Sequence, residues 1–92
     1  MSQYPAAALT NEAAIVSRCA VDSAAFAALY DHYFPRIYNY IRYRLQDRDV
    51  TDDITALVFE RALANIATYQ PQKAPFAAWL FSIARNAVND QL

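Results

Sequence analysis

The chain has 92 residues, a net charge of −1 and a hydrophobic fraction of 57%. A chain of this length forms one small domain with a modest core and little room for an enclosed active site. It has no run of apolar residues that approaches the length of roughly 18 residues needed to span a membrane. Its first residues also lack a basic segment before an apolar one, so we expect a cytoplasmic protein with no membrane partner. So much apolar surface on so short a chain favours a protein partner.

The sequence gives little support for catalysis. The chain has no glycine, which excludes every glycine-rich phosphate loop. His32 is the only histidine and has no evident cysteine or carboxylate partner, and no metal-ligand spacing occurs. Asp52 and Asp53 point apart as neighbours on a helix. We therefore expect no enzyme activity, no cofactor and no metal. The single cysteine, Cys19, allows no internal disulfide and is expected to be a small buried hydrophobic side chain.

The first half of the chain predicts two helices. Residues 1–9 are expected to form a flexible leader, and Thr10 to cap a short helix. Asp22 or Ser23 then caps a longer helix, whose apolar residues recur at helical spacing as far as residue 45. Pro35 lacks a backbone donor and crowds the preceding turn, so we expect a kink or break just before it.

The second half predicts two more helices, and no segment shows the alternation of a strand. Residues 46–49 form a turn, a third helix runs from about residue 50 to 68, and a fourth from about residue 75 to the end. Four helices with connections of roughly 2–6 residues make a compact all-α bundle. We expect three main helices and a short N-terminal one, together forming a single domain over residues 10–92.

Charge is distributed unevenly over this bundle. Four of the eight basic residues fall between positions 36 and 48, and five of the nine acidic residues fall between 47 and 60. One side of the third helix carries Asp49, Asp53 and Glu60, with Ala56 among them. This pattern fits a domain that meets both a nucleic acid and a basic protein surface, but also two ordinary solvated helix faces.

The fourth helix and the loop before it carry the most informative pattern. Trp79 and Asn86 are seven residues, or two turns, apart and share a flank beside the apolar face. Tyr69 precedes a short loop over residues 70–75. Aromatic rings offer a stacking face and amides read hydrogen-bonding edges, so this segment suits an unstacked base. The alternative is a core helix whose tryptophan is simply buried.

Three stretches resemble the second region of bacterial sigma factors, most closely the extracytoplasmic-function subgroup. Residues 76–86, FAAWLFSIARN, look like the signature F-x-x-W-L-x-x-I-A-x-N of the promoter-melting part. Residues 25–38, AFAALYDHYFPRIY, are similar to the first conserved helix. Residues 52–55, DDIT, and 58–63, VFERAL, are similar to the polymerase-binding helix. The stretches follow one another in the family's order from about Asp22 to Leu92.

The resemblance implies that the third helix docks on the clamp coiled coil of the largest subunit of RNA polymerase. The residues expected at the polymerase are Arg36, Tyr40, Asp53, Ala56, Leu57, Glu60 and Arg61. The chain departs from the family at Ala56-Leu57, where Gln-Glu is usual, and at Leu63, where tryptophan is common. These departures put polymerase affinity in question and equally suit an anti-sigma protein as a partner.

The resemblance further implies that the loop before the fourth helix catches a flipped base of single-stranded promoter DNA at the minus-ten element. The residues expected at the DNA are Tyr69, Lys73, Phe76, Trp79, Arg85, Asn86 and Asn89. Ser82 stands where many relatives carry a basic residue, and the basic run that usually follows is lacking. Because phosphate contacts supply most of the affinity, we expect this domain alone to hold DNA weakly.

The resulting expectation is a transcription initiation domain that binds core RNA polymerase and recognises and melts the minus-ten element. The alternative is a degenerate sigma-like domain that binds a regulator without initiating transcription. The promoter-reading helix-turn-helix domain that normally follows in this family is expected to be absent from these 92 residues.

Overall fold

The structure is a computed structural model that describes residues 11–92. The expected leader over residues 1–9 and Thr10, the expected cap of the first helix, lie outside the described residues. The described helices are α1 (Glu12–Cys19), α2 (Phe26–Leu45), α3 (Arg48–Asn65) and α4 (Phe76–Gln91), with short 3-10 helices η1 (Ser23–Ala25) and η2 (Ile66–Thr68). No strand occurs in residues 11–92. The expected all-α bundle of three main helices and a short first one is therefore confirmed.

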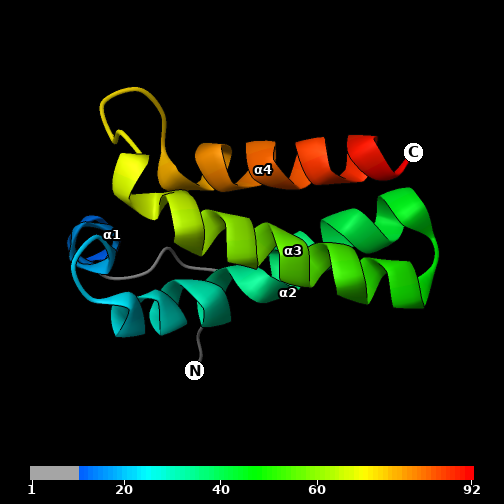
Figure 1. The fold of residues 1–92 in the computed structure, drawn as a ribbon, viewed down its shortest axis with the longest axis horizontal. Coiled ribbons are helices and arrows are strands. Elements are labelled where there is room, and N and C mark those ends of the chain that lie inside the picture. Colours follow the sequence, from blue (N-terminus) through cyan, green and yellow to red (C-terminus); the bar gives the residue numbers. More distant parts are fainter. Residues whose placement is uncertain (1–10) are drawn as a thin grey trace.

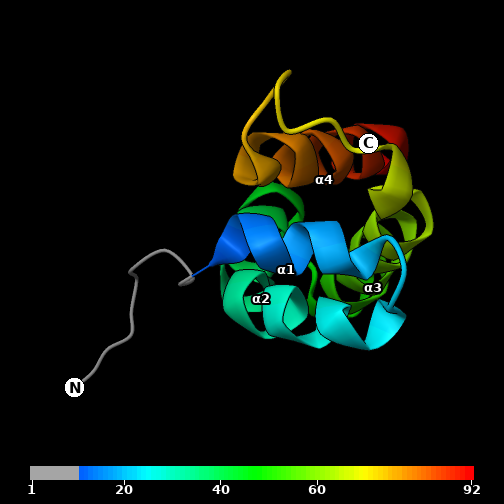
Figure 2. The same cartoon turned by 90° about the vertical axis from the view of Figure 1, so that its left-hand side faces the viewer.

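The three long helices run alongside one another, and α1 closes one end. α3 packs against both α2 and α4, and α4 runs back antiparallel to α3 after the loop between them (Figure 1). α1 lies across the ends of these helices (Figure 2). α3 is therefore the central helix, with one side turned to α2 and another to α4.

Every helix contributes apolar side chains to a single core. The buried apolar residues are Val16, Cys19, Phe26, Leu29, Tyr33, Ile37, Ile41, Ile54, Val58, Phe59, Ala62, Ile66, Phe76, Leu80, Ala84, Ala87 and Val88. Cys19 is buried as expected, and burial raises the pKa of its thiol, which keeps the sulfur unreactive. Leu63 of α3 does not belong to this core and is 39% exposed.

Aspartate side chains cap the starts of two elements. The Asp22 carboxylate accepts a hydrogen bond from the backbone N–H of Ala24 at 3.0 Å, which confirms Asp22 as the cap before the second helix. The Asp47 carboxylate accepts from the N–H of Val50 at 2.9 Å, so α3 begins at Arg48. The turn predicted over residues 46–49 is thus two residues too long, and Gln46 makes it in the left-handed conformation, with φ of 57°.

The third helix also ends earlier than predicted, because its last three expected residues form η2. Pro35 does not break the second helix, and α2 is continuous through it. Pro35 is exposed, so the carbonyl that loses its donor is on the solvent side. Buried Leu29 and Tyr33 before the proline, and Ile37 and Ile41 after it, hold both halves of the helix to the core. Of the predicted kink or break, a break is wrong because packing outweighs the loss of one hydrogen bond, and a kink stays a prediction.

One buried hydrogen bond joins α1 to α2. The Tyr33 hydroxyl donates to Oε1 of Glu12 at 2.8 Å. Burial, and then this bond to a carboxylate, raise the pKa of Tyr33 to about 12. The Tyr33 ring also lies 5.5 Å from the Phe76 ring of α4. Tyr33 therefore links the first, second and fourth helices.

Candidate nucleic-acid interface and protein-docking surface

Three aromatic rings meet where the loop over residues 69–75 enters α4. The centroid of the Tyr69 ring lies 5.6 Å from that of Phe76 and 5.2 Å from that of Trp79, and the Phe76 and Trp79 rings are 5.5 Å apart. We call these three residues the aromatic cluster. Phe76 is buried, with 3% of its surface exposed, whereas Tyr69 and Trp79 are half-buried. Phe76 therefore supports the cluster, and the other two present ring surface to solvent.

The loop is closed by the same tyrosine. The Tyr69 hydroxyl donates to the carbonyl oxygen of Ala74 at 2.6 Å, and the N–H of Lys73 donates to the carbonyl of Gln70 at 3.0 Å. Burial raises the pKa of Tyr69, so the phenol keeps the proton that it donates. Lys73 itself is exposed. The loop thus has a fixed shape, with its one cation in solvent.

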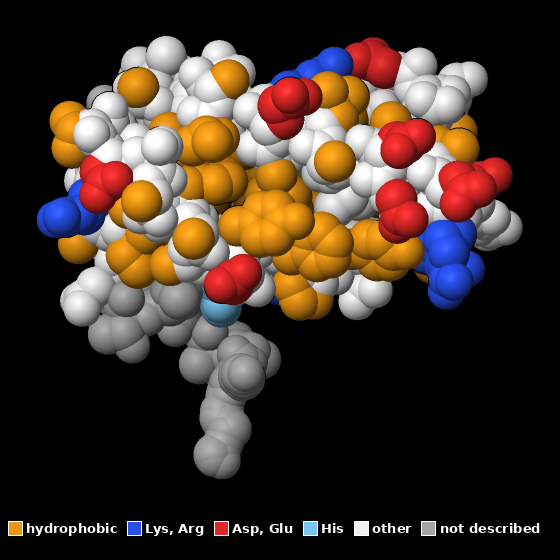
Figure 3. All heavy atoms as spheres, turned by 60° about the horizontal axis from the view of Figure 1, so that its bottom comes forward, with side chains coloured by type: hydrophobic (Ala, Val, Ile, Leu, Met, Phe, Trp, Pro, Cys, Tyr) orange, Lys and Arg blue, Asp and Glu red, His pale blue; other side chains and the backbone are white. Residues whose placement is uncertain are grey.

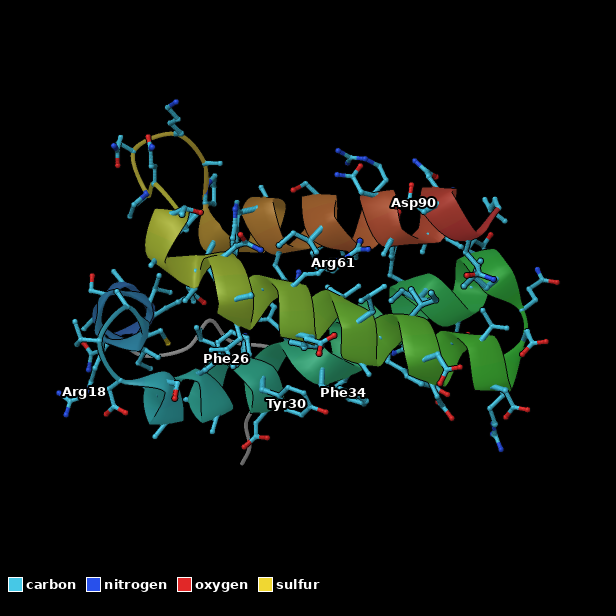
Figure 4. The ribbon with its side chains drawn as sticks, in the orientation of Figure 1. Arg18, Phe26, Tyr30, Phe34, Arg61 and Asp90 are labelled. Carbon is cyan, nitrogen blue, oxygen red and sulfur yellow. The ribbon has the colours of Figure 1, made fainter. Side chains whose placement is uncertain are left out.

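A groove of about 330 Å³ runs between the end of α3 with η2 on one side and the middle of α4 on the other. We call it the α3/α4 groove, and its lining residues are Arg61, Asn65, Thr68, Trp79, Ile83 and Asn86. Trp79 and Asn86 thus share one side of the groove, as their spacing predicts. Arg61, expected at the polymerase, lies in this groove with them, between the α3 and α4 ribbons (Figure 4). The lining holds one arginine and no carboxylate.

The remaining polar residues of α4 lie outside this lining. Arg85 and Asn89 are both exposed on α4, but neither lines the groove. The Ser82 hydroxyl donates to the carbonyl oxygen of Trp79 at 2.6 Å and so turns back onto its own helix. The Ser82 hydroxyl therefore has its hydrogen-bond partner within its own helix.

The acidic side of α3 is exposed. Asp53, Ala56 and Glu60 lie at the surface, and Leu57 is half-buried. This set of residues, 53, 56, 57 and 60, is called the acidic face of α3. None of the four lines the α3/α4 groove.

An aromatic strip lies between α2 and α3. The Tyr30 ring is 4.8 Å from Phe59 and 5.3 Å from Phe34, which is 5.7 Å from Tyr38. Tyr30 and Phe34 follow one another along α2 (Figure 4). Figure 3 shows hydrophobic side chains running across this face, with acidic side chains beside them and gathered toward one end. This face thus combines apolar area with negative charge.

Two of the residues expected at the polymerase lie elsewhere, against α4. The guanidinium carbon of Arg36 is 5.5 Å from the centroid of the Phe81 ring, and the Tyr40 ring is 5.6 Å from Phe81. Arg36 and Tyr40 are therefore held on the α2–α4 side. The predicted polymerase residues thus divide among the acidic face of α3, the α3/α4 groove and this side.

Residues 11–92 contain no cluster of histidine, cysteine and carboxylate side chains that could hold a metal ion. Within the same residues, no helix is both long and apolar enough to cross a bilayer.

Comparison with known proteins identifies the family. The family described as Sigma-70 region 2 matches residues 29–92. The chain is 46% identical over 66 residues to the ECF RNA polymerase sigma factor BldN of Streptomyces coelicolor, which covers 72% of this chain and 25% of BldN. It is 32% identical over 75 residues to the ECF RNA polymerase sigma factor RpoE of Cereibacter sphaeroides, and this match covers 77% of this chain and 39% of RpoE. No solved structure gives a significant match.

The chain belongs to the Sigma-70 region 2 family, as the sequence resemblance predicted. A third relative, the ECF RNA polymerase sigma factor SigX of Bacillus subtilis, is 32% identical over 65 residues, which cover 71% of this chain and 33% of SigX. The chain thus spans between a quarter and two fifths of the length of these relatives.

Sequence reasoning missed the α3 side of the groove. Arg61, Asn65 and Thr68 are spaced four and then three residues apart, as are Trp79, Ile83 and Asn86 on α4. This is the spacing of one helix face. The helical spacing that predicts a shared face for Trp79 and Asn86 is therefore also present at Arg61, Asn65 and Thr68. There, the nearby acidic residues favoured a different interpretation.

Proposed function

We propose that this chain is the second-region domain of an extracytoplasmic-function sigma factor, which binds core RNA polymerase and recognises and melts the minus-ten promoter element. The observation that carries the proposal is the meeting of the aromatic cluster with the α3/α4 groove at one end of the bundle. There, half-buried rings adjoin amide side chains, a combination that suits single-stranded nucleic acid. The relatives, all named as sigma factors, support the same role over that of a regulator-binding domain alone.

On the DNA side, Tyr69 and Trp79 offer stacking surfaces for an unpaired base, and Phe76 holds them in place from the core. Asn86 reads a base edge through its amide, which both donates and accepts hydrogen bonds. Lys73, Arg85 and Asn89 are exposed around this surface and contact the sugar-phosphate backbone.

On the protein side, the acidic face of α3 docks on the basic clamp coiled coil of the largest polymerase subunit. Asp53 and Glu60 supply charge, and Ala56 and Leu57 supply a small apolar centre. The aromatic strip beside it extends the apolar area (Figure 3). An anti-sigma protein that covers this face would keep the domain from polymerase. The domain acts in the cytoplasm and performs no chemistry itself, because the polymerase supplies the catalytic centre.

The proposal is tested with holoenzyme reconstituted from core polymerase. Asn86→Ala should leave capture of core polymerase unchanged and reduce promoter opening by about tenfold, since a good base contact contributes about 1–3 kcal/mol. The matched control is Asn39→Ala, another exposed asparagine, which lies on α2. Failure of the unaltered chain to bind core polymerase, or normal promoter opening by Asn86→Ala, would contradict the proposed function.

A further inference from the structure

Arginine side chains and aromatic rings alternate on the side of the molecule where α2 meets α4. Arg36, Tyr40 and Arg44 follow one another at four-residue spacing, so they share one side of α2. The two arginines are two helical turns apart, which is about 12 Å along the helix axis. Phe81 of α4 packs against the middle of this row, with its ring 5.6 Å from the Tyr40 ring. We call these four residues the basic strip.

The rings hold both arginine side chains in place. The guanidinium carbon of Arg36 lies 5.3 Å from the centroid of the Tyr33 ring and 5.5 Å from that of Phe81. The guanidinium carbon of Arg44 lies 5.7 Å from the centroid of the Tyr40 ring, and its Nη1 donates to the Tyr40 hydroxyl at 2.9 Å. An arginine that is already held in this way loses less conformational freedom when it binds a partner. The two positive charges are therefore pre-positioned.

The positive charge of the basic strip is not neutralised within the domain. Arg36 and Arg44 are exposed, and the single salt bridge of residues 11–92 joins Arg18 to Asp22 instead. The Tyr40 hydroxyl accepts a bond from Arg44, so its own proton is still available to an acceptor. A guanidinium group binds a carboxylate or a phosphate through parallel N–H···O bonds. The strip thus selects an anionic partner.

The rings of the basic strip favour carboxylates over a nucleic acid. Tyr40 and Phe81 are half-buried and meet edge to face, at an interplanar angle of 82°. Each also has a guanidinium group beside it, Arg44 at Tyr40 and Arg36 at Phe81. Their ring surface is therefore already used to hold the arginines, whereas single-stranded nucleic acid needs rings on which bases stack. The strip offers charge without a stacking surface.

We propose that the basic strip binds an acidic segment of a partner protein, whose carboxylates pair with Arg36 and Arg44. The basic coiled coil proposed for the acidic face of α3 would be repelled by these two charges. The acidic segment is thus a second protein contact, and it goes beyond the proposed function. Arg36 and Tyr40, which the sequence resemblance placed at the polymerase coiled coil, serve this second contact.

The test is a nuclear magnetic resonance titration of the 92-residue chain with two probes of similar charge, hexaglutamate and single-stranded hexathymidylate. Hexaglutamate should shift the Nε–H resonances of Arg36 and Arg44 along one saturation curve, and at a lower concentration than hexathymidylate. Arg36→Gln should weaken hexaglutamate binding about two- to fivefold, as expected for one exposed ion pair. Phe81→Leu keeps the net charge but removes a ring that holds Arg36, so it should weaken binding about twofold.

The matched control is Arg42→Gln, which removes the same charge from an exposed position of the same helix. Arg42 lies two residues before Arg44 and so points to a different side of α2, and its loss should leave hexaglutamate binding nearly unchanged. Equal effects of Arg42→Gln and Arg36→Gln would overturn the proposal, because net charge alone would then set the affinity. It is also overturned if the strip resonances do not move.

The second probe identifies the class of partner. If hexathymidylate shifts the Arg36 and Arg44 resonances at a lower concentration than hexaglutamate, the basic strip is a nucleic-acid surface and the proposal fails. The proposed function stands in each of these cases, because the acidic face of α3 and the α3/α4 groove use other residues. Failure of the unaltered chain to bind core polymerase would instead contradict the proposed function and leave the basic strip unaffected.

Discussion

At the scale of single residues, two threonines one turn apart on α3 have different hydrogen-bonding states. Both are buried, at 0% exposure for Thr51 and 1% for Thr55. The Thr51 hydroxyl donates to the carbonyl oxygen of Asp47 at 2.7 Å, whereas the Thr55 hydroxyl has no hydrogen-bond partner among the described residues. A buried hydroxyl without a partner carries its desolvation cost uncompensated.

Replacing Thr55 with valine should therefore stabilise the protein. Valine keeps the branched shape and removes the unpaired hydroxyl, so Thr55→Val should raise the free energy of unfolding by about 1 kcal/mol. Thr51→Val is the control and should lower it by about the same amount, because it removes a satisfied bond. Chemical denaturation of the three proteins measures both changes, and a loss of stability in Thr55→Val would show that its hydroxyl is satisfied.

Ionisation of the Tyr33 phenol should make the free energy of unfolding depend on pH in the alkaline range. Its pKa is raised from an ordinary value of 10 to about 12, because burial and the bond to Glu12 favour the protonated phenol. A group whose pKa is raised on folding contributes its full stabilisation below pH 10 and loses it as pH rises towards 12. The free energy of unfolding should thus fall across this range.

Tyr33→Phe is the comparison, because its ring cannot ionise. The stability difference between the unaltered protein and Tyr33→Phe should be constant from pH 7 to 9 and then shrink or change sign between pH 10 and 12. Denaturant midpoints at each pH provide the measurement. Parallel pH profiles for the two proteins would rule out Tyr33 as the titrating group.

At the scale of helices and loops, α4 carries a residue that opposes its proposed partner. Asp90 lies four residues beyond Asn86, so it continues the row of Trp79, Ile83 and Asn86 by one turn. Figure 4 shows it near the C-terminal end of α4. A carboxylate there would repel a DNA strand that continued past the groove, and it also lies unfavourably at the negative end of the helix dipole.

Asp90→Asn should therefore strengthen binding of hexathymidylate about two- to fourfold at low salt, and less at high salt because the repulsion is screened. It should also stabilise the fold by up to about 0.5 kcal/mol through the helix dipole. Asp31→Asn, an exposed carboxylate on α2, is the control for general charge and should have a smaller effect. Equal gains from both substitutions would mean that net charge alone sets the affinity.

The approximate positions of the helices could be predicted from the sequence. Their first and last residues, and the way in which their faces pack against one another, were less predictable. Apolar spacing located all four helices because burial of one face dominates their stability. The start of α3 was misplaced because Asp47 caps it through a side-chain bond that apolar spacing does not encode. Continuity through Pro35 depends on packing of residues before and after it, which is a tertiary effect. The position of Arg61 in a groove with Trp79 and Asn86 depends on how α3 and α4 pack together, which apolar spacing does not encode.

At the scale of the whole molecule, the net charge is only −1, but negative and positive side chains are separated around α3. α3 exposes Asp53 and Glu60 on its acidic face, whereas Arg61 lines the groove shared with α4. The two surfaces are thus adjacent on the central helix, because Leu57 of the acidic face lies one turn before Arg61. Under the proposed function, this arrangement would let a basic protein surface and a DNA strand bind at the same time without competing for the same residues.

The separation predicts that polymerase binding can be removed without affecting the groove. Asp53→Arg reverses the charge at the acidic face of α3, and a like charge facing a basic coiled coil should weaken capture of core polymerase by at least about tenfold. Because Asp53 is exposed, the free energy of unfolding should change by no more than about 0.5 kcal/mol. Binding of hexathymidylate to the isolated chain should be unchanged or slightly tighter, since the added charge lies outside the groove.

Asp31→Arg makes the same reversal on α2 and should retain polymerase binding, so it separates a local contact from an effect of total charge. Affinity for core polymerase, followed by fluorescence anisotropy of the labelled chain at two salt concentrations, distinguishes the variants. The defect of Asp53→Arg should be largest at low salt, where an exposed charge is least screened. Undiminished polymerase binding by a folded Asp53→Arg protein would move the docking surface away from the acidic face of α3.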